Sequence, residues 1–184
     1  MKTIRSLWLA TAVTFAAVIP QSQAQLGGLT KSLTGTVTAA SLNGDLTGGL
    51  DFFAKANDHF LTALVPAEKA QAIREKLKSE DQKDRSQAVK DSTALIKESA
   101  EAQLAEKKPL DDKAKAEIAL GQKEIAKGIT KWAAVGVSLG MAAQKGGGDA
   151  ALVAAIPVAT EMIKDLPALT AMNAIIKKLN AANK

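Results

Sequence analysis

Apolar residues recur every three to four positions along most of the chain, which is the spacing of a single buried helix face. The pattern begins at Leu50, and Pro66 suits the first turn of a second helix. After the polar stretch SEDQKD, we expect a third helix from about Asp84 to Lys107. The predicted inward positions are Leu50, Phe53, Asn57, Phe60, Leu61 and Leu64 in the first helix, and Ala88, Val89, Ser92, Leu95, Ile96, Ser99, Ala102 and Leu104 in the third.

The spacing is most regular after Pro109, where two rows of residues repeat every seven positions. The rows are Ile118, Ile125, Trp132 and Leu139, and beside them Ala114, Gly121, Gly128, Val135 and Ala142. Large residues flanked by small ones predict a seam that holds a partner helix at close range. A glycine inside a helix costs about 1 kcal/mol relative to alanine. The glycines at 121, 128, 136 and 140 therefore predict a facing backbone that lies close to them.

The remaining sequence predicts two further helices. Gly146 to Gly148 end the long helix and Asp149 can cap the next one, which Pro157 is expected to kink or split. Pro167 restarts the chain in a final helix. The predicted inward positions are Leu152, Ile156, Ala159, Thr160 and Ile163, and then Leu169, Met172, Ile176 and Leu179. We therefore expect an all-α fold, a single bundle of about five to six helices over residues 50–184.

Two segments that precede the predicted bundle, residues 1–24 and 25–49, differ from it in composition. Lys2 and Arg5 precede an apolar stretch that ends near Pro20, and Ser22 and Ala24 provide the small residues of a cleavage site. This pattern predicts a signal peptide over residues 1–24 and a protein exported to the periplasm or beyond. Residues 25–49 are rich in Gly, Ser and Thr, and we expect a flexible N-terminal arm there.

The segment from Lys131 to Ile163 raises the question of membrane contact. It holds two uncharged blocks, residues 132–143 and 150–160, joined by the glycine turn. Each block is far shorter than the roughly 20 apolar residues of a membrane-spanning helix. The interpretation we favour is a helical hairpin in the core of the bundle. A hairpin that inserts into a membrane and a pocket for an apolar ligand remain the alternatives.

Charge and composition exclude some function classes. The chain has 24 Lys and Arg against 19 Asp and Glu, and two of the basic residues are in the leader, which leaves a net charge of +3 after cleavage. Such a small excess does not indicate nucleic-acid binding. The chain contains no cysteine, so thiolate nucleophiles and sulfur-ligated metals are excluded.

The remaining inventory of reactive residues is small. His59 is the only histidine, and a Ser-His-Asp site would need it beside Asp58 or Asp51 with a serine that no motif marks. Glu117 and Glu124 share one helix face but lie among lysines, which favours surface ion pairing over acid–base chemistry. The KGGGDAA turn lacks the Gly-Lys-Ser/Thr of a phosphate loop. We predict no catalytic, cofactor-binding or metal-binding residue, and we expect His59 to be dispensable.

These observations favour an exported, non-catalytic helical bundle of a bacterial-type cell envelope that binds or scaffolds a protein partner. The alternative is a membrane-active protein, or one that binds lipid or another apolar ligand, through the hairpin at 131–163. The sequence does not identify the partner or the oligomeric state.

Overall fold

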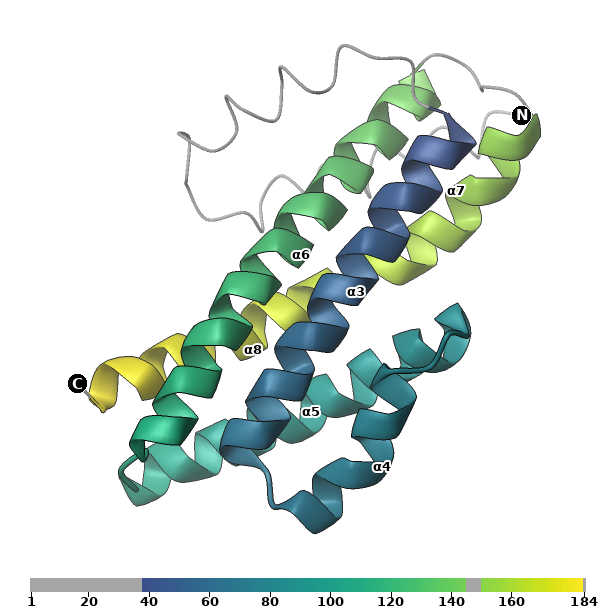
Figure 1. Cartoon of the computed structure of the whole chain (residues 1–184). Coiled ribbons are helices and arrows are strands. Elements are labelled where there is room, and N and C mark those ends of the chain that lie inside the picture. The colour runs from purple at the N-terminus through teal and green to yellow at the C-terminus, as the bar shows by residue number, and fades with distance from the viewer. Residues whose placement is uncertain (1–37, 145–149, 184) are drawn as a thin grey trace. The chain divides into compact units, whose positions relative to one another are not determined.

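The computed structural model describes residues 38–144 and 150–183. These residues form six α-helices and no strand (Figure 1). The helices are α3 (Ala39–Leu64), α4 (Ala67–Leu77), α5 (Gln82–Glu106), α6 (Asp112–Gln144), α7 (Ala150–Ile163) and α8 (Leu166–Ala182). The prediction of an all-α bundle is therefore confirmed. The predicted signal peptide at 1–24, the predicted arm as far as residue 37 and the predicted turn at 146–148 with its cap Asp149 lie outside the described residues.

The first helix begins earlier than the sequence indicated. We expected a flexible arm up to residue 49, but residues 39–49 belong to α3. The N–H of Ser41 donates to Thr38 Oγ1 and the N–H of Thr38 donates to Ser41 Oγ, both at 3.1 Å, which is a reciprocal N-terminal cap. Leu42 and Leu46 are buried and extend the spacing of Leu50 by two more turns. The prediction missed this leucine spacing because residues 39–49 are rich in Gly, Ser and Thr, which is typical of flexible segments.

The other helix ends follow the expected local chemistry. Pro66 is the N-cap of α4, and Asp81 caps α5 by accepting the N–H bonds of Lys83 and Asp84. Asp111 Oδ1 accepts the N–H of Ala114 at 2.7 Å in the first turn of α6. Pro157 lies inside α7 and does not split it. The predicted bounds of the third helix, Asp84 and Lys107, thus lie within two residues of those of α5.

The described chain divides into two compact units. Unit 1 comprises residues 38–46, 131–144 and 150–164, and unit 2 comprises residues 47–130 and 165–183. The division falls inside α3 and inside α6. The prediction of a single domain over 50–184 stays a prediction.

In unit 2, α3 and α6 run antiparallel, with Phe53 opposite Gly128 and Phe60 opposite Gly121. A Cβ at Gly121 would lie 2.5 Å from Cε1 of Phe60, and one at Gly128 would lie 2.7 Å from Cε1 of Phe53. We had expected a helix backbone against these glycines, but aromatic rings occupy the space. Both glycines are required because a methyl group would overlap a ring.

In unit 1, Trp132 is 1% exposed, and its Nε1 donates to the carbonyl oxygen of Leu46 at 3.0 Å. The inward row of the long helix continues here through Val135 and Leu139, which are buried as predicted. Gly140 differs from the glycines of unit 2, because no atom of the described residues lies within 4 Å of its Cβ position. The expected close backbone contact at Gly140 is therefore wrong.

Most predicted inward positions are buried, but Ile156 and Thr160 in α7 are only half-buried, and α5 departs further from the prediction. Its buried residues are Ala88, Val89, Ser92, Thr93, Ile96 and Ala100. The sequence placed Ser99 and Ala102 on this face, but Ser99 is only half-buried and Ala102 is exposed. The 3.6-residue period carries the stripe from Ile96 to Ala100, one position beyond Ser99. Helix α5 packs against both α4 and α8.

Candidate functional site

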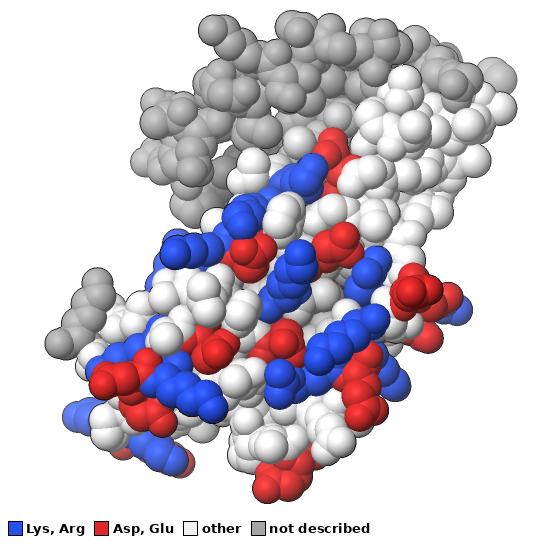
Figure 2. All heavy atoms as spheres, viewed as in Figure 1, with Lys and Arg blue, Asp and Glu red and all other residues white. Residues whose placement is uncertain are grey.

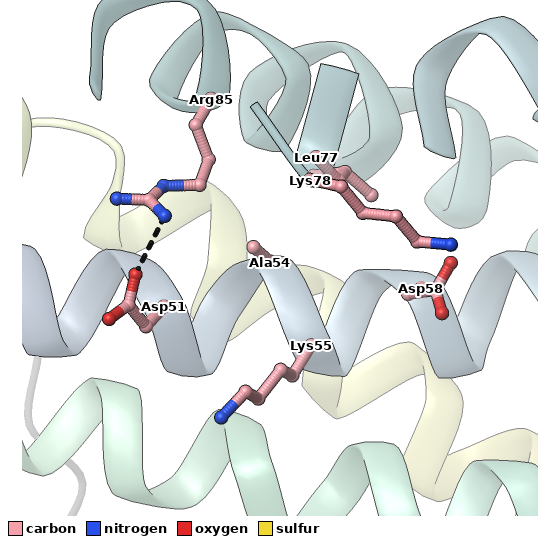
Figure 3. Close-up of a pocket in the computed structure, with 7 residues that line it drawn as sticks. All are labelled: Asp51, Ala54, Lys55, Asp58, Leu77, Lys78 and Arg85. Carbon is pink, nitrogen blue, oxygen red and sulfur yellow. Dashed lines mark ion pairs between the residues drawn. The ribbon is translucent and has the colours of Figure 1, made fainter. Parts of the chain in front are cut away.

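A pocket of about 340 Å³ opens in unit 2 between α3, the end of α4 and the first turn of α5 (Figure 3). Asp51 and Asp58 are seven residues apart on α3, so both carboxylates lie on one face of that helix, two turns apart. The lining residues are Asp51, Ala54, Lys55, Asp58, Leu77, Lys78 and Arg85. The pocket therefore combines two acidic and three basic side chains around a small apolar floor.

Both carboxylates of the pocket are ion-paired. Asp51 Oδ1 lies 3.0 Å from Arg85 Nη1, and Arg74 contacts Asp58 through Nε at 2.6 Å and through Nη2 at 3.4 Å. The hydrogen bond to Asp58 raises the pKa of Arg74 above its usual value, although partial burial acts against it. The negative charges of Asp58 and Glu117 add to the rise. Through these ion pairs, Asp58 links α3 to α4 and Asp51 links α3 to α5.

His59 lies beside the pocket on α3 and joins α3 to α6. Its Nδ1 is 2.7 Å from Glu117 Oε2, and both side chains are half-buried. Within the described part of the chain, neither Asp51 nor Asp58 is the hydrogen-bond partner of His59. In this part of the chain, His59 is thus not paired with either aspartate, as a Ser-His-Asp site would require.

The two glutamates singled out on α6 have different partners. Glu124 accepts a bond from Lys127 at 2.7 Å on the exposed surface, as the sequence indicated. Glu117 pairs with His59 instead of a neighbouring lysine. A contact between residues so far apart in the chain has no local signal, so sequence reasoning missed it.

A buried polar cluster connects α3 to α5. Asn57 is fully buried, and its Nδ2 lies 2.7 Å from Ser92 Oγ, 3.0 Å from Thr93 Oγ1 and 3.1 Å from the carbonyl oxygen of Val89. The burial of Asn57 was predicted, but its polar partners were not. These hydrogen bonds fix the alignment of α3 and α5. The cluster is closed to solvent, so it offers no access to a substrate.

The outward face of α7 carries no charged residue from Ala150 to Thr160. Val153 and Val158 are 51% and 54% exposed, and Val137 on α6, also in unit 1, is 45% exposed. The exposed residues over the first nine positions of α7 are Ala150, Ala151, Val153, Ala154, Pro157 and Val158. In Figure 2 the surface over α7 is white, whereas blue and red residues gather over the helices of unit 2. A contiguous exposed apolar patch of this kind is a candidate contact site.

No cluster of three or more His, Asp or Glu in residues 38–144 and 150–183 is placed to hold a metal ion. None of the helices in these two ranges is both long and apolar enough to cross a membrane. No protein-family model, curated protein or solved structure matches the chain.

Proposed function

We propose that the protein is an exported helical bundle of a bacterial-type cell envelope that has no catalytic activity and binds or scaffolds a protein partner. The observation that carries the proposal is the outward face of α7, where six apolar residues are exposed and no charge occurs before Glu161. The ion pairs of Asp51, Asp58 and His59 support the non-catalytic part, since each candidate reactive group has a structural partner.

Export is the second part of the proposal and rests on the leader pattern at 1–24. If the leader is removed as proposed, N-terminal sequencing of the protein from its native envelope yields a chain that starts at Gln25, within two residues. A purified chain that still begins at Met1 contradicts the proposed export.

Membrane or lipid binding through the hairpin at 131–163 is the second candidate, because Val137, Val153 and Val158 are all exposed in this segment. Helices that lie on membranes usually combine large apolar side chains with Lys or Arg beside them. The outward face of α7 bears no apolar side chain larger than valine and no Lys or Arg, and Trp132 is buried and bonded to the carbonyl oxygen of Leu46 rather than available to lipid. A protein partner therefore agrees better with the composition of this face.

Capture from the native envelope tests the proposal. The wild-type chain, a Val153→Glu/Val158→Glu variant and a Leu120→Glu control serve as baits after crosslinking, and mass spectrometry identifies the captured proteins. Leu120 is a suitable control because it is an apolar side chain of similar exposure, 45%, in unit 2. The proposal predicts that the double variant loses a protein that wild type and control retain. Retention by all three contradicts it.

Liposome flotation with the same three chains separates the two candidates. The protein-partner proposal predicts that none of them floats with the vesicles. Flotation of the wild type and the control, but not of the double variant, supports the lipid-binding alternative instead.

A further inference from the structure

Helix α4 has few contacts that hold it in unit 2. Only Ala70 and Leu77 are buried among its 11 residues, whereas α5 and α8 each bury six side chains. Its N-cap, Pro66, makes no side-chain hydrogen bond, unlike Asp81 at the start of α5. An isolated helix shorter than about 12–15 residues is marginal in water, so α4 depends on its neighbours to stay folded. Elements with few buried apolar contacts are the ones that open locally.

The contact between α4 and α3 is incompletely packed. The pocket of about 340 Å³ lies between them, with Leu77 and Lys78 at the end of α4 on one side and Ala54 and Asp58 of α3 on the other (Figure 3). Where the pocket meets α5, Arg85 Nε is buried without a hydrogen bond to any described atom. Protein interiors are normally close-packed, so this space deprives α4 of contacts that would hold it on α3.

One ion pair spans the gap between the two helices. Arg74 on α4 donates to Asp58 on α3 through both Nε and Nη2, at 2.6 Å and 3.4 Å. Among the described residues, no other ion pair or side-chain hydrogen bond joins α4 to α3. A two-pronged contact between arginine and a carboxylate is both stronger and more specific in geometry than a single surface contact. The pair therefore has the position and the strength of a latch.

We propose that α4 is a lid that opens from α3 as one unit, and that the Arg74–Asp58 pair is the latch that holds it shut. Because Leu77 and Lys78 move with α4, its opening exposes the floor of the pocket at Ala54. The ion pair thereby controls access to the pocket. This lid belongs to unit 2 and is independent of the role proposed for the outward face of α7.

Native-state hydrogen exchange tests whether α4 opens separately. In the wild type, we expect the amides of residues 67–77 to exchange through one shared opening, faster than the buried amides of α5 and α8. Arg74→Gln removes the latch and should speed exchange in α4 by about three- to tenfold, without a comparable change in α8. Lys90→Gln is the control, because Lys90 is as exposed as Arg74, at 37%, but pairs with Asp165 outside α4. It should leave exchange in α4 unchanged.

Two further measurements identify the ion pair as the cause. Asp58→Asn should speed exchange in α4 as much as Arg74→Gln does. The double variant should be no faster than either single variant, because each change alone already removes the contact. An increase in NaCl from about 0.05 M to about 1 M should speed exchange in wild-type α4, since salt screens partly exposed charges, but not in the double variant.

A single introduced thiol tests access to the pocket. The chain contains no cysteine, so Ala54→Cys places one reporter on the pocket floor, where Ala54 is 6% exposed. Alkylation of this thiol by iodoacetamide should be accelerated by Arg74→Gln as much as exchange in α4 is. Ala100→Cys is the control, because Ala100 is buried in α5 and does not line the pocket. Its alkylation should not respond to Arg74→Gln.

Each part of the proposal can fail separately. Exchange in wild-type α4 as slow as in α8, or a uniform acceleration throughout unit 2 in Arg74→Gln, overturns the lid. Exchange in α4 that responds neither to Arg74→Gln nor to salt overturns the latch. Faster exchange in α4 without faster alkylation of Ala54→Cys overturns the control of the pocket.

Discussion

The two compact units share the long helices α3 and α6 but differ in the residues that they expose to solvent. In unit 2, phenylalanine rings pack over Gly121 and Gly128, and the surface is crossed by ion pairs such as Arg85 with Asp51 and Lys90 with Asp165. In unit 1, the indole of Trp132 is buried and the outward face of α7 carries no charge from Ala150 to Thr160. The inward rows are equally regular in both units. The difference lies in the outward faces: a charged outward face suits a helix that packs only within its own unit, and an uncharged one suits a helix that also contacts a partner.

The ion pairs of unit 2 are better regarded as a property of its surface than as the source of its stability. Exposed pairs such as Lys97 with Glu101 contribute about 0–1 kcal/mol each. The aromatic rings buried against glycine contribute more, because removal of a buried phenylalanine side chain typically costs about 3–5 kcal/mol. Stability in both units therefore depends on a few large side chains, and the following substitutions test each unit in turn.

The largest effect is expected from Trp132→Ala in unit 1. The change leaves a cavity and removes the Nε1 hydrogen bond to Leu46, so the free energy of unfolding should fall by about 3–5 kcal/mol. Urea denaturation measures the loss, and Val137→Ala, an exposed apolar residue of the same unit, is the control and should change it by less than about 0.5 kcal/mol. Hydrogen exchange should lose protection first in 131–144. An equal loss throughout 47–130 would show that the two units do not open separately.

Gly121→Ala and Gly140→Ala should act in opposite directions. At Gly121 the new methyl group overlaps the Phe60 ring, and overpacking of about 1–3 kcal/mol should exceed the gain in helix propensity of about 1 kcal/mol. At Gly140 no described atom lies near, so the propensity gain should raise stability by up to about 1 kcal/mol. Thermal unfolding of both variants gives the comparison. Higher melting temperatures for both would mean that the seam of unit 2 is as open as that of unit 1.

The smallest effect is expected from His59→Ala in unit 2. The variant loses the 2.7 Å contact with Glu117, but both side chains are partly exposed, so the loss should not exceed about 1 kcal/mol. Partner capture should be unchanged, because the proposed binding face belongs to unit 1. Urea denaturation and the capture experiment measure the two properties. Loss of the captured protein would place the functional surface at His59 and reverse the comparison.

Much of the fold could be predicted from local patterns. The seven-residue rows of α6 predicted that Ile118, Ile125 and Trp132 are buried, and Pro66 indicated where α4 begins. The start of α3 could also have been found, from the Thr38–Ser41 cap and the spacing of Leu42, Leu46 and Leu50. Composition outweighed periodicity in that segment, and for that reason the predicted arm was too long.

The candidate site was less predictable, because its contacts join residues that are distant in the chain. Asn57, Asp58 and His59 are consecutive on α3, yet their partners lie on three different helices. These partners are Ser92 on α5, Arg74 on α4 and Glu117 on α6, respectively. Nothing local distinguishes Glu117 from the other glutamates of α6. The partners depend on which helices pack together, and no pattern within one helix contains that information.

The sequence by itself determined the helices, their ends and their inward rows, because caps and the 3.6-residue period act over a few neighbouring residues. Only the tertiary structure decided what meets each inward residue. It placed Phe60 over Gly121 and left Gly140 open, although both are glycines inside the same helix. It also decided that one apolar face of α7 is buried and the other exposed, since a helix that is apolar on both sides gives no local signal of which side its own chain will cover.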